Sequence, residues 1–259
     1  MSTATSDDRP PAPPTAPAVW SVLVLTAAAG GCWVVTVERM QGMDMGPATA
    51  LGGLGWFVVV WVTMMAAMML PSLSPMAVAY SRSAGAGRVR SVARTVVFAA
   101  GYLLAWAAFG VLAYAVVDAV RALDVGVLAW GRAGRYVAGG VVLGAALYEL
   151  TALKGRCLRH CRDSSLLRRR PGVTGALTMG VEQGGFCVGC SGALMAALFA
   201  LGVMSLAWML VIAALIAIEK LLPWTAPSIG LTAAALGLLG VAIVVVPEQV
   251  PWLTIPMSM

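Results

Sequence analysis

The chain has 259 residues, of which 60% are hydrophobic and only 11% are charged, whereas about a quarter of the residues in a typical globular protein carry a charge. With a mean hydropathy of +0.89, this composition excludes an ordinary soluble protein and predicts an all-α, polytopic transmembrane helix bundle. A membrane-spanning helix needs about 20 apolar residues, so the chain has room for about six to seven spans and for no large soluble domain. The net charge of +6 comes mostly from grouped arginines, which in membrane proteins report orientation, and no nucleic-acid-binding motif accompanies them.

The N-terminal segment 1–18 carries five prolines and few apolar side chains, so we expect a disordered tail. Val19–Val37 is long enough to cross a membrane and lacks the short basic start of a secretory signal peptide, which makes it a retained first span. The transmembrane helical domain is expected over 19–246, and 247–259 is expected to be a short C-terminal tail.

The middle of the chain predicts three more spans with polar connections. Leu51–Leu70 ends at Pro71, which cannot simply continue a helix. A polar, arginine-containing loop is expected over 81–94, before the apolar runs Thr95–Val117 and Tyr136–Leu153.

The last part of the chain predicts three spans after a basic stretch at 154–171. Val173–Gln183 is weakly apolar and carries Glu182, so we interpret it as an interfacial helix broken at Gly184-Gly185. The remaining spans are expected at Phe186–Leu201, Leu206–Leu222 and Ile229–Val246, with a turn near Gly202 after the first of them.

Charge bias orients the predicted spans. The stretches 81–94 and 154–171 together hold eleven Lys and Arg residues, and the stretches 38–50 and 118–135 hold four. Because basic loops favour the cytoplasmic side, we expect a multi-pass protein of the inner (plasma) membrane with a cytoplasmic N-terminus.

Two cysteine motifs, one within the basic stretch at 154–171 and one after it, are expected at the cytoplasmic ends of their helices. Cys187 and Cys190, at i and i+3, share one helical face and are close enough to bind one metal ion or to form a disulfide. Packing is the alternative, because free cysteine behaves as a small hydrophobe. Cys157-x-x-His160-Cys161 lies among arginines, which favour reactive thiolates; a surface histidine beside cysteines without a role is the alternative there.

Ligand type favours a soft metal. Thiolates suit Cu(I) and Zn(II), and fifteen methionines against one histidine favour Cu(I). Zinc remains possible, because sets of thiolates with or without an imidazole are usual in structural zinc sites.

Methionines and buried acids complete the candidate ligands. Methionines at the end of the second span could bind copper, or could simply fill an irregular core. Ionisable residues inside membrane helices are costly and usually functional, which applies to Glu149, Glu182 and Glu219, although the latter two could instead be solvated at the interface. The predicted metal ligands are Cys157, His160, Cys161, Cys187, Cys190, Met64, Met68, Met69 and Glu149. The outer methionines Met40, Met43 and Met45, and more weakly Met257 and Met259, are candidates for copper capture, with a simple turn as the alternative for the first three.

Five short motifs carry a family resemblance. They are Trp61-x-x-Met64-x-x-Ala67-Met68-Met69-x-Pro71, Leu153-Lys154-x-x-Cys157-Leu158-x-x-Cys161-Arg162, Cys187-x-Gly189-Cys190-x-x-x-Leu194-Met195, Gly202-Val203-Met204 and Glu219-Lys220-x-x-Pro223. Together, over about Trp61 to Trp224, they resemble the DUF2182 family of predicted metal-binding, copper-chaperone-like integral membrane proteins. The resemblance implies a metal role and names no reaction. The family usually has Cys-Trp where this chain has Ser191-Gly192, so either the metal affinity is expected to be weaker here, or Glu149 or a methionine is expected to replace a lost ligand.

These observations favour a membrane protein, not an enzyme, that holds or hands over Cu(I). Its expected partners are the lipid bilayer, a metal ion and a soluble metallochaperone or acceptor protein. We expect Cys157, Cys161, Cys187 and Cys190 to form one site. A membrane thiol oxidoreductase using Cys187 and Cys190 and a secondary transporter, supported only by the intramembrane acids, are the alternatives.

Overall fold

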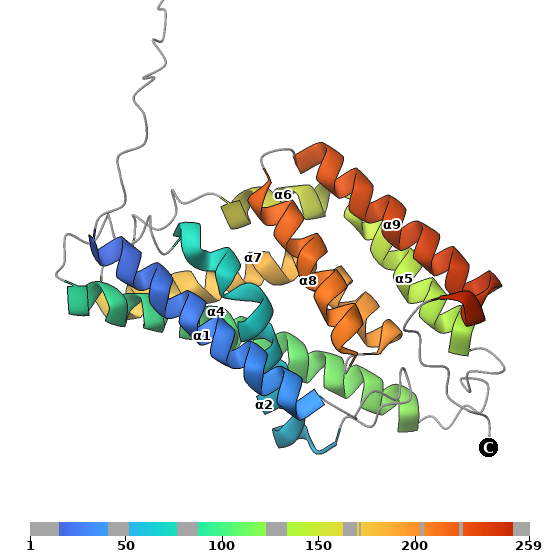
Figure 1. The fold of residues 1–259 in the computed structure, drawn as a ribbon, viewed down its shortest axis with the longest axis horizontal. Helices are drawn as coiled ribbons and strands as arrows, with labels where there is room; N and C mark the ends of the chain where they lie inside the picture. The colour runs from blue at the N-terminus through green and yellow to red at the C-terminus, as the bar shows by residue number, and fades with distance from the viewer. Residues whose placement is uncertain are drawn as a thin grey trace, which may run out of the picture.

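The computed structural model describes residues 16–40, 52–76, 88–122, 134–162, 170, 172–202, 205–222 and 225–250. Helices make up nearly all of this part of the chain, and it contains no strand (Figure 1). The all-α prediction is therefore confirmed for the described residues. The α-helices are α1 (Ala16–Met40), α2 (Leu54–Met69), α4 (Arg88–Ala122), α5 (Arg135–Glu149), α6 (Ala152–Arg162), α7 (Gly172–Leu201), α8 (Leu206–Leu221) and α9 (Thr225–Val245).

Four helices, α1, α4, α7 and α9, are long and apolar enough to cross a membrane. The pair α5 and α6 is bent by 67° and could form a fifth, broken span. By contrast, α2 and α8 have 16 residues each, and a helix of that length rises only about 24 Å, less than the roughly 30 Å of a bilayer core. Within the described residues, the structure thus supports four to five spans, and the expected six to seven are not confirmed.

The basic stretch after α5 is helical at its start, where the sequence predicted a loop. Lys154 and Leu158, one turn apart, are buried, whereas Arg156 and Arg159 are exposed. This spacing gives α6 one face toward the bundle and one charged face. The loop expected at 81–94 is likewise helical from Arg88 onward, where α4 begins.

The predicted break at Gly184-Gly185 is wrong, because α7 continues through both residues. A Cβ at Gly184 would lie 2.7 Å from the carbonyl oxygen of Tyr102 and 2.6 Å from Cβ of Ala105, both on α4. Gly184 therefore allows two helix backbones to approach closely, and it does not end the helix.

Two predicted boundaries are confirmed. α2 ends at Met69, and Pro71 opens a short 3₁₀ helix, Pro71–Leu73. Gly202 has a φ of +115°, a conformation that favours glycine, and it ends α7 before α8 begins.

The helices pack as a bundle around large apolar and aromatic side chains. α4 lies along α7, α5 lies beside α9, and α6 packs on α7 (Figure 1). Trp61 of α2 is buried and donates a hydrogen bond from Nε1 to the carbonyl oxygen of Trp106 at 2.9 Å. The buried Tyr102 continues this core toward α7.

Some predictions concern residues outside the described part of the chain. The tail at 1–15, most of the C-terminal tail and the methionines Met43, Met45, Met257 and Met259 belong to this group. Residues 16–18, expected to belong to the disordered tail, are the start of α1, and Met40 is buried at the end of that helix.

Candidate metal centre

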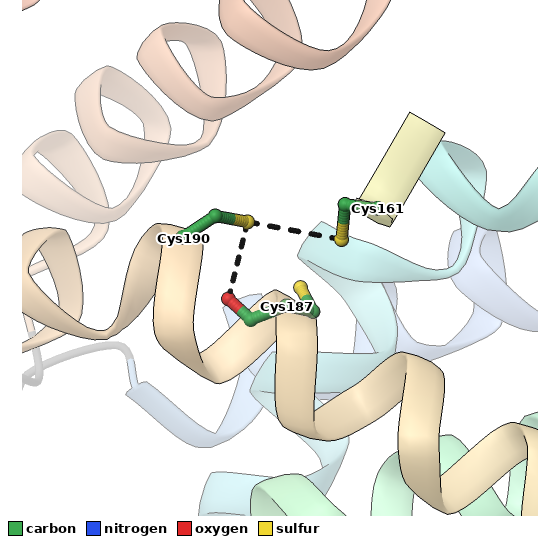
Figure 2. A group of neighbouring side chains, drawn as sticks. All are labelled: Cys161, Cys187 and Cys190. Carbon is green, nitrogen blue, oxygen red and sulfur yellow. Dashed lines mark hydrogen bonds between the residues drawn. The ribbon is translucent and has the colours of Figure 1, made fainter. Parts of the chain in front are cut away.

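Three cysteine thiols converge where α6 meets α7. Cys161 lies at the end of α6, and Cys187 and Cys190 lie in α7. Their Sγ atoms are all within 4.8 Å of one another, and those of Cys161 and Cys190 are 3.7 Å apart (Figure 2). Cys187 and Cys190 are buried and Cys161 is partly buried. We call these three residues the three-cysteine site.

The local fold explains this convergence. Gln183, Cys187 and Cys190 follow one another at helical spacing and therefore share a face of α7. Nε2 of Gln183 donates a hydrogen bond to the carbonyl oxygen of Cys161 at 2.8 Å. The end of α6 is thus held against the α7 face that carries the two other thiols.

Two polar groups contact the sulfur of Cys187. The hydroxyl oxygen of Tyr102 and Nζ of Lys220 each lie 2.8 Å from Sγ of Cys187. An ammonium and a hydroxyl can both donate to a thiolate, so they favour the anionic form that binds metal ions. Lys220 reaches the site from the end of α8 and Tyr102 from the middle of α4.

The spacing of the thiols suits a soft metal ion. A metal held at about 2.3 Å from each of three sulfurs keeps them roughly 4 Å apart. The separation of 3.7 Å between Cys161 and Cys190, and the 4.8 Å limit for the whole set, agree with this requirement. Modest movement of side chains is enough to bring all three sulfurs onto one ion.

A protein-family model described as PpoB2, copper chaperone, matches residues 58–243. The chain belongs to the PpoB2 copper chaperone family. No curated protein and no solved structure matches it. The match supports the expected copper-chaperone-like family, although it does not carry the name DUF2182. It also supports copper binding in general and a metal-handling role, and the three-cysteine site lies within the matched residues.

In this copper chaperone family member, three of the four cysteines predicted to form one site lie together. Cys157 is partly buried and faces Gly189 of α7, where an added Cβ would lie 2.6 Å from its Sγ. It is not part of the set whose sulfurs all lie within 4.8 Å of one another. His160 is exposed, and its ring stacks on that of Phe186 with 4.4 Å between centroids.

The predicted methionine ligands lie in the core. Met64, Met68 and Met69 are all buried in the main hydrophobic cluster. Only Met69 has a described contact with the surroundings of the site, through Nζ of Lys220 at 3.6 Å from its Sδ. This placement favours packing for Met64 and Met68.

Glu149, also predicted as a ligand, belongs to a buried ion cluster. Nζ of Lys154 is bonded to Oε2 of Glu149 and, at 2.7 Å, to Oε2 of Glu219. We call these residues the Lys154 triad. Glu219 is thus not the solvated helix end that the sequence allowed. Glu182, in contrast, is about half exposed and pairs with Arg170 at 2.7 Å, which agrees with its interpretation as a solvated residue.

Three residues around the site, Tyr102, Gln183 and Lys220, were not predicted from the sequence. Gln183 was within reach, because it precedes Cys187 by one helical turn. Lys220 could hardly be predicted, because a lysine at the end of an apolar helix usually extends to the membrane interface and not into a buried site. No sequence pattern links Tyr102 to the site, because only the packing of α4 on α7 brings it to Cys187.

Proposed function

We propose that this protein is a membrane-embedded copper chaperone that binds Cu(I) as its cargo on Cys161, Cys187 and Cys190 and hands it over by exchange of thiolate ligands. The observation that carries this proposal is the convergence of three thiols, two of them buried, within 4.8 Å of one another. The apolar helices that surround the site and the copper chaperone family support it. A site partly closed by helices limits oxidation of Cu(I) while still allowing ligands to exchange.

The donor set favours Cu(I) over Zn(II). Structural zinc is almost always held by four protein ligands in a tetrahedron. Among the described residues, the three-cysteine site offers three thiols, and the polar groups in contact with Cys187 are the ammonium of Lys220 and the hydroxyl of Tyr102, neither of which is a fourth thiolate or an imidazole. Soft ligands in low number suit Cu(I).

The cysteine series tests this proposal. Full-length protein purified in detergent under reducing conditions, from cells grown with copper, is expected to hold about one copper ion per chain. Cys161→Ser, Cys187→Ser and Cys190→Ser should each weaken copper binding on the order of tenfold or more, because a hydroxyl is a poor ligand for Cu(I). Titration against a Cu(I) chelator of known affinity measures the loss.

Matched controls come from the two other cysteines. Cys157 lies one turn from Cys161 on the same helix, and Cys32 lies on α1. The variants Cys157→Ser and Cys32→Ser should both bind copper as the wild type does. If Cys157→Ser weakened copper binding as much as Cys161→Ser, Cys157 would be a fourth ligand of the site. Protein that binds no copper but shows a reversible Cys187-Cys190 disulfide would favour the thiol oxidoreductase instead.

The membrane orientation is a separate part of the proposal. With the basic segment at 154–171, which holds seven Lys and Arg residues, in the cytoplasm, the end of α6 and its metal centre lie on the cytoplasmic side. In a variant that lacks the native cysteines, Arg168→Cys should resist an impermeant thiol reagent in intact cells, whereas Asp44→Cys should react. Labelling at position 168 from outside would contradict the orientation.

A further inference from the structure

A cavity of about 270 Å³ adjoins the three-cysteine site. It lies between the segment after α2 and the helices α4, α6, α7 and α8, so all the elements that build the metal centre also bound it. Its walls include Cys161 and Tyr102. The cavity therefore gives a ligand direct access to one of the three thiols.

Two cationic side chains line this cavity, Arg162 and Lys220, and none of the described lining residues is acidic. Nη1 of Arg162 is buried and has no hydrogen-bond partner in the described part of the chain. Lys220 contacts Ser72 and the sulfur of Cys187 and has no carboxylate partner among the described residues. The cavity thus has an excess of positive charge and an unused donor.

A buried guanidinium nitrogen without an acceptor is costly, and a carboxylate is the acceptor that fits a guanidinium best. The cavity is slightly smaller than the usual range of about 300–1,000 Å³ for ligand pockets, so a small molecule fits and a folded protein domain does not. Since one wall is a copper-binding thiol, a ligand with both a carboxylate and a thiolate matches both features.

We propose that this cavity binds a small anionic thiol-carboxylate that carries Cu(I), with its carboxylate on Arg162 and its thiolate beside Cys161. This inference rests on the proposed function and names the carrier from which the three-cysteine site exchanges copper. Exchange is a ligand substitution: a bond between copper and the carrier sulfur breaks, and a bond between copper and Sγ of Cys161 forms. The proton of the Cys161 thiol passes to the released carrier thiolate. Copper remains Cu(I), so no oxidant or reductant is needed.

The test compares two copper donors with the full-length reduced protein in detergent. One is the Cu(I)-glutathione complex, which is anionic and carries carboxylates, and the other is the Cu(I)-acetonitrile complex, which has neither. Arg162→Gln should slow loading from Cu(I)-glutathione by at least about tenfold, because a hydrogen bond to a charged group is lost. Loading from Cu(I)-acetonitrile should keep the wild-type rate and capacity, which also shows that the variant is folded.

Arg159→Gln is the matched control, because this arginine is exposed on the same helix, and it should load normally from both donors. Arg162→Lys should recover part of the rate with Cu(I)-glutathione. Equal slowing with both donors, or no slowing with Cu(I)-glutathione, would overturn this inference and leave the copper site in place. If the wild-type protein takes copper from neither donor, the proposed function fails and this inference fails with it.

Discussion

Replacing Lys154 with methionine is expected to lower the free energy of unfolding by about 3–5 kcal/mol, the usual cost of removing one partner from a buried ion pair. Lys154 lies in α6 just after the bend, and it joins Glu149 at the end of α5 to Glu219 near the end of α8. All three side chains are almost completely buried. Without the ammonium, two carboxyl groups would face each other inside an apolar bundle, where charge is expensive.

Thermal or denaturant unfolding of the purified protein in detergent measures this loss. Arg159→Met is the matched control, because it removes a cation from the exposed face of the same helix, where substitutions usually change stability by less than about 0.5 kcal/mol. If Lys154→Met proved as stable as Arg159→Met, the Lys154 triad would have no structural role.

A triple variant separates charge from packing. Lys154→Met combined with Glu149→Gln and Glu219→Gln leaves no charge in the triad while keeping similar side-chain volumes. It should recover much of the stability lost in Lys154→Met, because neutral replacement of a buried ion cluster is often tolerated. Failure to recover would mean that the bonds from Lys154 to the two carboxylates stabilise the fold beyond neutralising their charge.

Local patterns in the sequence were enough to predict most of the helices. Long apolar runs predicted α1, α4 and α9, and Pro71 and Gly202 marked helix ends through their backbone preferences. The number of spans could not be predicted equally well, because apolar composition does not distinguish a helix that crosses the bilayer from a shorter buried one such as α2. Helix α6 was not predicted, because the many arginines of the basic stretch after α5 suggested a solvated loop.

The candidate site was predictable only as far as residue chemistry and local spacing allowed. Cys187 and Cys190 share a helical face by spacing alone, and Cys161 is a soft ligand in a basic segment. The position of α6 on α7 decides that Cys161 joins them while Cys157 does not, and no local pattern encodes this choice. Glu149 was interpreted as a ligand because ionisable residues inside membrane helices are usually functional. Glu219 is 70 positions away in the chain, so no local pattern could reveal that Lys154 bridges the two.

The role of Gly184 and Gly185 in α7 likewise could not be predicted from local sequence, because it depends on how α7 packs against α4. Gly184→Ala should destabilise the protein by about 1–3 kcal/mol, the usual cost of overpacking. The added methyl group would lie 2.7 Å from the carbonyl oxygen of Tyr102 and 2.6 Å from Cβ of Ala105. A backbone carbonyl cannot turn aside as a flexible side chain can, so α4 and α7 must move apart. Tyr102 would then be displaced from Cys187, and copper binding should weaken as well.

Gly185→Ala is the control that the chain itself offers. The two glycines are adjacent in one helix, but Gly185 is exposed and an added Cβ there has no neighbour within 4 Å. Because alanine favours a helix over glycine by about 0.5–1 kcal/mol, Gly185→Ala should leave the protein as stable as wild type or slightly more so. Unfolding in detergent and copper titration of both variants test the pair. Equal destabilisation by the two substitutions would indicate that the glycines serve a flexible break in α7, and that close packing against α4 is not their role.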